Sequence, residues 1–378
     1  MKYLWINIKK KLPLYIVCAV LFIISAFSVM SSQDFYIAYS VETGMKVYGE
    51  PNSGLLLYLI LFFFIMTILP LFGMNYRNSL ARSDLFRQAP YKNKRIRYME
   101  HLSALTIILI AFTIGYVFLV LGMLIKNNLA KVPAADEMLY YELIKYHFVY
   151  YVPAYFIALA MGVCQYAIAY LFVSRSNNTL NSLMMLILGQ LILLLYLFAP
   201  IYLFYRTTSF NQSTLGLPIS FIYRLFEPLI IYGKGTNIFK FNSNVNAFAS
   251  IQLIISLVVF FALAIIGIIA FFVEKDPSSE YAGRATSNKP YQEIIFHVAA
   301  FILGAFLCGL GKNLIYSFFS FFTFAAMYYT FYGLLNRNFK LKLWQIVLIV
   351  SIIGLVICTD IISISVNVIN GSSSGLFF

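Results

Sequence analysis

Charged residues are scarce in this sequence. They make up 11% of the 378 residues, whereas 61% of the residues are hydrophobic. A water-soluble globular protein of this length needs far more polar side chains to cover its surface. The composition therefore indicates an integral membrane protein, whose length reflects the number of membrane spans rather than the number of soluble domains.

Several kinds of catalytic or metal-binding motif are also missing. A phosphate-binding loop needs a lysine directly after its closing glycine, and the nearest match, Gly304 to Lys312, has another spacing within an apolar run. The histidines and cysteines lie apart, without the spacing of metal ligands or of a disulfide framework. They are His101, His147, His297, Cys18, Cys164, Cys308 and Cys358. We expect no metal site, no catalytic residue and no cofactor bound by this chain.

The apolar runs contain almost no ionisable side chains. Ion-coupled transporters place acidic or basic groups near the middle of the membrane to bind the coupling ion. Here the polar residues nearest that position are Gln165, Gln190 and Gln252, and Asp360 falls at the end of the last run. The glutamines suit hydrogen bonds between helices, or else the lining of a path. Any transport would need an energy source outside the chain.

Apolar runs of about 20 residues predict an all-α fold, a polytopic transmembrane helix bundle of about nine spans. The predicted spans are 12–30, 55–74, 102–125, 148–173, 183–205, 248–273, 294–312, 315–335 and 343–361. Before the first span, Leu4, Trp5 and Ile8 share one side at helical spacing, which predicts an interfacial N-terminal helix.

The basic residues predict the orientation of these spans. With the N-terminus in the cytoplasm, 18 of the 27 Lys and Arg residues lie on the cytoplasmic side. The prediction is therefore a multi-pass protein of the cell (plasma) membrane with an extracellular C-terminus. Because this bias accounts for the net charge of +13, we expect no nucleic-acid partner.

Three segments are then expected outside the cell. Residues 31–54 and 126–147 are predicted to be polar loops, the second with a short surface helix. Residues 217–232 are apolar but too short to span, with Arg224 and Glu227 placed to pair and a break at Pro228, as in a re-entrant segment. After the last span, residues 362–370 alternate with period two, which is typical of a strand.

Residues 75–101 form the most basic interruption of the first half, with seven of the 27 basic residues. Ser79–Ala89 is predicted to be a short helix with Ser79 as a possible N-cap and Pro90 as its stop. It presents two kinds of side chain, the apolar Leu85 and Phe86 and the charged Arg82, Asp84 and Arg87. Basic residues at this boundary also suit a loop that faces anionic lipid.

This order of features resembles the membrane subunit of an ABC-2-type transporter. The stretch Ser83–Ile96 is similar to the family pattern of an acidic residue, a hydrophobic residue, a proline and basic residues, and Ala89 stands where the family more often has Leu. The matching positions are Asp84, Leu85, Pro90, Lys92 and Lys94. A second cytoplasmic turn is similar to that of larger, Firmicute-type members, with Lys275 where Arg is common. It contains Glu274, Lys275, Glu280 and Gly283.

The resemblance implies a division of the chain and a function. Residues 1–273 would form a six-span permease core, 274–293 a cytoplasmic linker, 294–361 extra spans, and 362–378 an extracellular tail with a strand of an outer domain. The helix at 79–89 would dock on a separate ATPase subunit, which would hold ATP and Mg. The permease would work as a homo- or heterodimer in the lipid bilayer and export an amphipathic peptide or lipid-like substrate.

Two other functions fit the same sequence. One is a non-transporting membrane sensor or immunity protein built on this scaffold. The other is an intramembrane lipid-modifying enzyme, which would require Arg224, Glu227 and His147 to converge in an outer cavity.

Overall fold

In the computed structural model, the chain is described at residues 2–32, 36–40, 46–48, 53–74, 93–129, 139–143, 151–174, 176–195, 247–273, 289–310, 314–336, 340–347, 349–351 and 354. These residues are almost entirely helical, as predicted. The labelled helices are α1 (Lys2–Ser32), α2 (Ser53–Gly73), α4 (Asn93–Leu129), α5 (Tyr151–Val173), α6 (Thr179–Leu195), α9 (Ala247–Val273), α10 (Lys289–Leu310) and α11 (Leu314–Asn336). Residues 343–347 and 349–351 are helical as well.

Each of these helices coincides with a predicted span, because long apolar runs satisfy their backbone hydrogen bonds most simply as helices. Two stretches, Lys94–Lys126 and Tyr151–Val173, are long and apolar enough to cross a membrane. The predicted interfacial N-terminal segment is not a separate helix. It is the first part of α1, which continues through Pro13 without a break.

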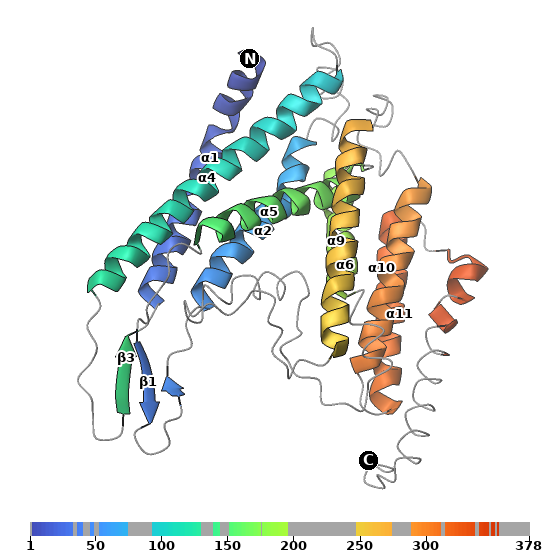
Figure 1. Cartoon of the computed structure of the whole chain (residues 1–378). Helices are drawn as coiled ribbons and strands as arrows, with labels where there is room; N and C mark the ends of the chain where they lie inside the picture. Colours follow the sequence, from blue (N-terminus) through green and yellow to red (C-terminus); the bar gives the residue numbers. More distant parts are fainter. Residues whose placement is uncertain are drawn as a thin grey trace.

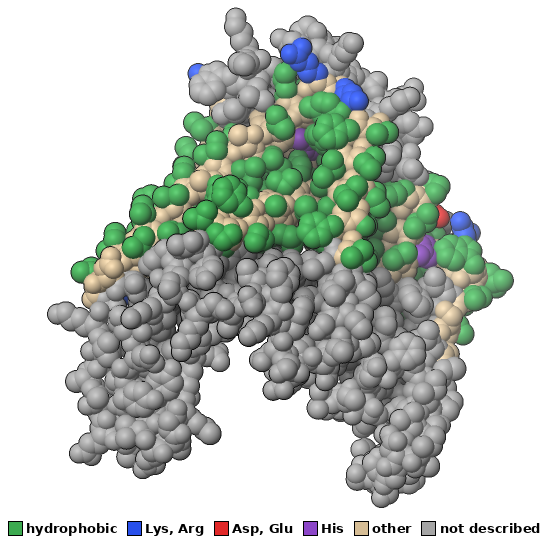
Figure 2. All heavy atoms as spheres, viewed as in Figure 1, with side chains coloured by type: hydrophobic (Ala, Val, Ile, Leu, Met, Phe, Trp, Pro, Cys, Tyr) green, Lys and Arg blue, Asp and Glu red, His purple; other side chains and the backbone are tan. Residues whose placement is uncertain are grey.

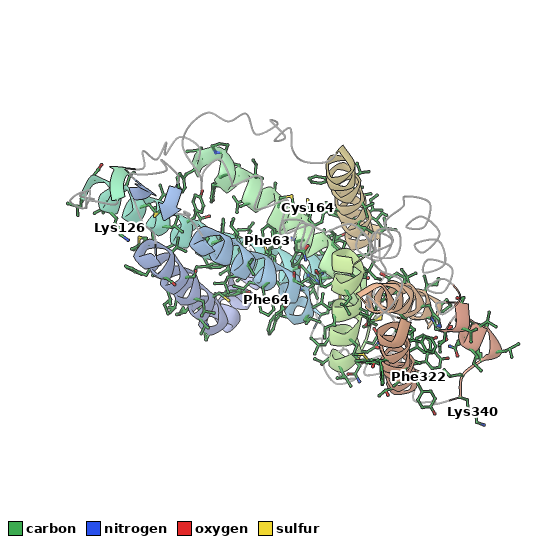
Figure 3. All side chains as sticks on the ribbon, turned by 90° about the horizontal axis from the view of Figure 1, so that it is seen from below. Phe63, Phe64, Lys126, Cys164, Phe322 and Lys340 are labelled. Atoms are coloured by element: carbon green, nitrogen blue, oxygen red, sulfur yellow. The ribbon has the colours of Figure 1, made fainter. Side chains whose placement is uncertain are left out.

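The helices form two groups joined by α5 and α6. In the first group α1 packs along α4, α2 packs against both of them and against α5, and α9 packs against α5. In the second group α10 packs against α6 and α11. Figure 1 shows the first group on one side of the molecule and the second group on the other. In Figure 3, Lys126 of α4 and Phe322 of α11 lie at opposite sides.

The two ends of the bundle differ. Helix α1 begins, α2 ends, α4 begins and α9 ends at the upper end in Figure 1. Exposed basic side chains lie in the first part of α1 (Lys9) and the first turn of α4 (Lys94, Arg95), so we call this end the basic end. We call the opposite end the sheet end, because three short strands lie there.

The strands correct one sequence-based prediction. The prediction of a short surface helix within 126–147 is wrong, because Leu139–Leu143 is a strand, β3. It pairs antiparallel with β1 (Tyr36–Ser40), which also pairs with β2 (Lys46–Tyr48) in the order β2-β1-β3. Tyrosines favour strands once a partner strand is available, and such pairing overrides a local helical pattern. Beside the sheet, the Lys126 ammonium donates to the Met30 carbonyl at 2.6 Å and ties α4 to α1.

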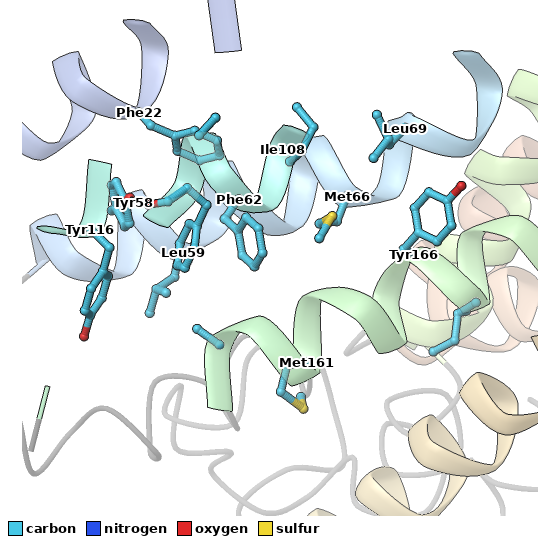
Figure 4. Packing of buried hydrophobic residues seen from close by; sticks show 14 of the residues in the cluster. Phe22, Tyr58, Leu59, Phe62, Met66, Leu69, Ile108, Tyr116, Met161 and Tyr166 are labelled. Carbon is cyan, nitrogen blue, oxygen red and sulfur yellow. Dashed lines mark hydrogen bonds between the residues drawn. The ribbon is translucent and has the colours of Figure 1, made fainter. Parts of the chain in front are cut away.

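Aromatic side chains fill the core where α1, α2, α4 and α5 meet (Figure 4). Phe112 is fully buried, and its ring stacks on Phe62 with 3.9 Å between centroids. Phe22, Tyr58 and Tyr116 surround it at 5.5 to 5.8 Å. Two buried hydroxyls of this core have backbone partners: Tyr58 donates to the Phe112 carbonyl and Tyr116 to the Tyr151 carbonyl, both at 2.9 Å.

The outer surface of the described helices is largely apolar. Large aliphatic and aromatic side chains are exposed along α1, α4 and α9, and they cover most of the described face in Figure 2, with basic side chains only at its edges. Val20, Phe118 and Ile265 are examples, at 46%, 47% and 57% exposure. An apolar surface of this extent is typical of contact with lipid.

Helices α5 and α9 approach so closely that Gly267 cannot carry a side chain. A Cβ at Gly267 would collide with the backbone carbonyl of Ala167, whereas a Cβ at Gly354 would have no atom within 4 Å. We therefore expect Gly267→Ala to lower the free energy of unfolding by about 1–3 kcal/mol, since the two backbones must separate. Gly354→Ala is the matched control, and it should not lower stability, because alanine favours a helix more than glycine does and meets no neighbour there. Thermal unfolding in detergent measures both, and equal stability of the two variants would contradict the close approach.

Candidate functional site

Most of the sequence-predicted site residues lie outside the described part of the chain. This applies to the coupling helix and its stop (Ser79, Arg82, Asp84, Leu85, Phe86, Arg87, Pro90), to the second cytoplasmic turn (Glu274, Lys275, Glu280, Gly283) and to the outer re-entrant segment (Arg224, Glu227, Pro228). His147 and residues 362–370 lie outside it as well. Their roles stay predictions. Lys94 is described, and it is exposed in the first turn of α4.

The structure does describe the helix ends from which the two predicted cytoplasmic segments continue. Residues 75–92 follow α2 and lead into α4, and residues 274–288 follow α9 and lead into α10. The start of α4 is joined to the end of α9, because the Tyr98 hydroxyl donates to the Phe272 carbonyl at 3.1 Å. That carbonyl belongs to the last turn of α9, where helix carbonyls have no partner within the helix.

Aromatic rings reinforce this contact. The Tyr98 ring lies 5.1 Å from Phe271 and 5.7 Å from Phe272, measured between centroids. Two cations of α4 lie beside the same ring, with Lys94 Nζ at 5.7 Å and Arg97 Cζ at 5.6 Å from its centroid. Cations at such distances are attracted to the electron-rich face of the ring. Tyr98 is therefore fixed both by α9 and by its own helix.

One turn further along α4, His101 is buried at 1% exposure and contacts three other helices. Its Nδ1 atom is hydrogen-bonded to the Tyr166 hydroxyl of α5 at 2.5 Å. Its ring meets Tyr170 at 5.2 Å and Phe271 at 5.5 Å, both edge-on. A Cβ at Gly73, the last residue of α2, would overlap the imidazole. Glycine at this position thus allows the ring to enter between α2 and α4.

We call these six side chains the aromatic junction: Tyr98, His101, Tyr166, Tyr170, Phe271 and Phe272. It lies at the basic end of the bundle. In the sequence, His101 is only a single histidine directly before the predicted span 102–125. The spacing of Tyr98 and His101, and of Tyr166 and Tyr170, places each pair on one helix face, but no local pattern indicates that the two faces meet at α9.

The beginning of α10 is held at the same end by α5 and α6. The Tyr291 hydroxyl donates to the Leu171 carbonyl at 2.7 Å, and Gln292 Nε2 donates to Asn181 Oδ1 at 2.8 Å. Gln292 and Asn181 are both buried. Both helix ends that flank residues 274–288 are therefore fixed by hydrogen bonds to other helices.

The polar residues in the middle of the first group form a short hydrogen-bonded ladder. Gln165 of α5 donates through Nε2 to Thr67 Oγ1 at 2.8 Å and to Gln190 Oε1 at 2.9 Å. Thr67 uses its own proton to donate to the Phe63 carbonyl at 2.8 Å, so its oxygen faces Gln165 as an acceptor. The ladder thus links α2, α5 and α6, which agrees with the interpretation of Gln165 and Gln190 as interhelical groups. The side chain of Gln252 lies outside the described part of the structure.

Removing the central amide of the ladder should destabilise the bundle. We expect Gln165→Met, which keeps a side chain of similar length, to lower the free energy of unfolding by about 1–2 kcal/mol, because each interhelical hydrogen bond in a membrane contributes roughly 0.6–1 kcal/mol. Unfolding by denaturing detergent in mixed micelles measures the change. Thr67→Val removes one of the two bonds and should give about half the effect, and no change in either variant would show that the ladder is not stabilising.

Among the described residues, no three His, Cys, Asp or Glu side chains come together as a metal-binding group. Comparisons with protein-family models, with curated proteins and with solved structures gave no match for this chain.

Proposed function

We propose that the chain is the membrane-spanning permease subunit of an ATP-driven ABC exporter. The observation that carries the proposal is the direct contact between Tyr98 at the start of α4 and Phe272 at the end of α9. The resemblance assigns the helix at 79–89 to an ATPase and places a second cytoplasmic turn at 274–283. The segments that contain them, 75–92 and 274–288, continue from these joined helix ends. A single partner bound at the basic end would therefore act on both segments.

The distribution of side chains supports membrane embedding of the bundle. Apolar side chains are exposed along α1, α4 and α9, while polar ones such as His101, Gln165 and Gln292 are buried. This arrangement is favourable in lipid, where exposed aliphatic groups are well solvated and polar groups need internal partners. The basic end, with its exposed lysine and arginine side chains, would then face the cytoplasm. This orientation places the N-terminus inside the cell.

In this proposal the chain itself is not an enzyme and binds no cofactor. A separate ABC ATPase subunit holds ATP and Mg and docks on the helix at 79–89. The permease pairs with a second copy or with a homologous permease, and the substrate is an amphipathic peptide or lipid-like molecule. That substrate class is favoured by the aromatic side chains and the scarcity of charge within the spans.

Purification of the tagged full-length chain from its membrane in mild detergent tests the proposal. We expect an ATPase subunit to remain bound and the purified complex to hydrolyse ATP in a magnesium-dependent, vanadate-sensitive manner. A chain that purifies without any ATPase, under conditions that keep it folded, would overturn the exporter function and favour a sensor or immunity role.

A further inference from the structure

The aromatic junction contains two different kinds of link between α4 and α9. Tyr98 reaches α9 directly, through its hydroxyl to the Phe272 carbonyl and through its ring to Phe271. His101 reaches α9 through ring contact with Phe271 and reaches α5 through Tyr166 and Tyr170. Tyr170 and Phe271 also contact each other, at 5.1 Å. The ends of α4 and α9 are therefore connected both directly and by way of α5.

We propose that Tyr98 and His101 are positioning residues that make the start of α4 and the end of α9 move as one unit. Displacement of residues 75–92 by a bound partner would then shift the end of α9, and with it residues 274–288. It would also reach α5, which crosses the middle of the bundle and carries Gln165. This inference rests on the proposed function and adds the residues that transmit the movement.

The packing around His101 explains how a displacement of α4 would be passed on to α9 and α5. Closely packed side chains with fixed hydrogen bonds resist independent displacement of the helices they join. His101 is enclosed by α2, α5 and α9, so the start of α4 cannot move sideways without displacing one of them. In contrast, α11 packs mainly against α10, and its Tyr328 and Tyr332 rings contact Phe296 and His297 of that helix. It therefore provides a reference that does not touch the junction.

The first test uses hydrogen exchange and needs no partner. The full-length chain in lipid nanodiscs is compared with Tyr98→Phe, which keeps the ring and removes the hydroxyl bond. We expect the amides of residues 270–273 to exchange about fivefold faster in the variant, the factor given by loss of one ordinary hydrogen bond. Tyr155→Phe is the matched control, because it removes a hydroxyl hydrogen-bonded to Thr113 at 2.6 Å, also between α4 and another helix. It should not change exchange at 270–273.

The second test measures movement in the purified complex with its ATPase. Spin labels are placed at exposed positions, Leu102 on α4, Val273 on α9 and Phe322 on α11, after the four native cysteines are replaced by alanine. On trapping with ADP and vanadate, we expect the distance from Leu102 to Phe322 to change and the distance from Leu102 to Val273 to stay constant. In the double variant Tyr98→Phe, His101→Phe, the second distance should shift or broaden as well.

The outcomes separate this inference from the proposed function. A distance from Leu102 to Val273 that changes in the unmodified complex, or stays constant in the double variant, overturns the inference while leaving the exporter function in place. If no distance changes on nucleotide trapping, the proposal that the ATPase drives movement of this chain is contradicted. The hydrogen-exchange experiment then tests the link between α4 and α9 by itself. Unchanged exchange at 270–273 in Tyr98→Phe would show that the Tyr98 hydroxyl does not hold the end of α9.

Discussion

Replacing Arg82, Asp84 and Arg87 together with alanine is expected to abolish co-purification of the ATPase and the associated ATP hydrolysis. The predicted helix Ser79–Ala89 has these three charged side chains, and a docking contact made by a short helix depends on few residues. Truncating one side of a hydrogen-bonded charge pair in an interface costs about 2–5 kcal/mol, or at least about 30-fold in affinity. Three such losses would leave no complex at micromolar concentrations.

The control for this variant is a pair of changes far along the chain from the helix at 79–89. Lys340 and Lys342 are exposed in the described structure, and replacing both with alanine removes positive charge without altering the helix at 79–89. We expect ATP hydrolysis to be retained in this pair. The alternative interpretation of residues 75–101 as a lipid-facing loop makes the opposite prediction, because the triple variant would then weaken association with anionic vesicles and leave ATP hydrolysis intact.

The helices of this protein could be predicted from sequence because their cause is local. An apolar run of about 20 residues contains within itself the reason to be helical, whatever it packs against. The sheet could not be predicted in the same way. Strand β1 at Tyr36–Ser40 pairs with β3 at Leu139–Leu143, and the favourable interaction exists only once α1 and α4 bring the two segments together.

The same distinction applies to the candidate site. The predictions for residues 79–90 and for the turn at 274–283 rest on patterns of charge, proline and glycine within short stretches. The aromatic junction depends on a contact between Tyr98 and Phe272, which are 174 positions apart in the sequence. Both are aromatic residues in a sequence with 37 Phe and 29 Tyr, so composition gives no reason to select these two. Their role follows only from the meeting of the start of α4 with the end of α9.

Phe112→Ala is expected to be the most destabilising single substitution in the first group of helices. The ring is fully buried, stacks on Phe62 at 3.9 Å and lies between α1, α2 and α4. Truncation leaves a cavity at the meeting point of these helices, and such substitutions cost about 3–5 kcal/mol. Its backbone carbonyl still accepts the Tyr58 hydroxyl, so the loss measured in a denaturing-detergent titration reports the ring alone.

Phe118→Ala on the same helix separates packing in the core from contact with the surroundings. Phe118 is 47% exposed on the apolar surface of α4. If that surface contacts lipid, acyl chains fill the space left by the ring, and we expect a loss of less than about 1 kcal/mol, within the range of substitutions away from buried features. A loss as large as that of Phe112→Ala would mean that Phe118 is covered by protein, such as a second permease, rather than by lipid. Repeating the comparison at increasing dilution distinguishes these cases, because only a subunit contact weakens as the protein is diluted.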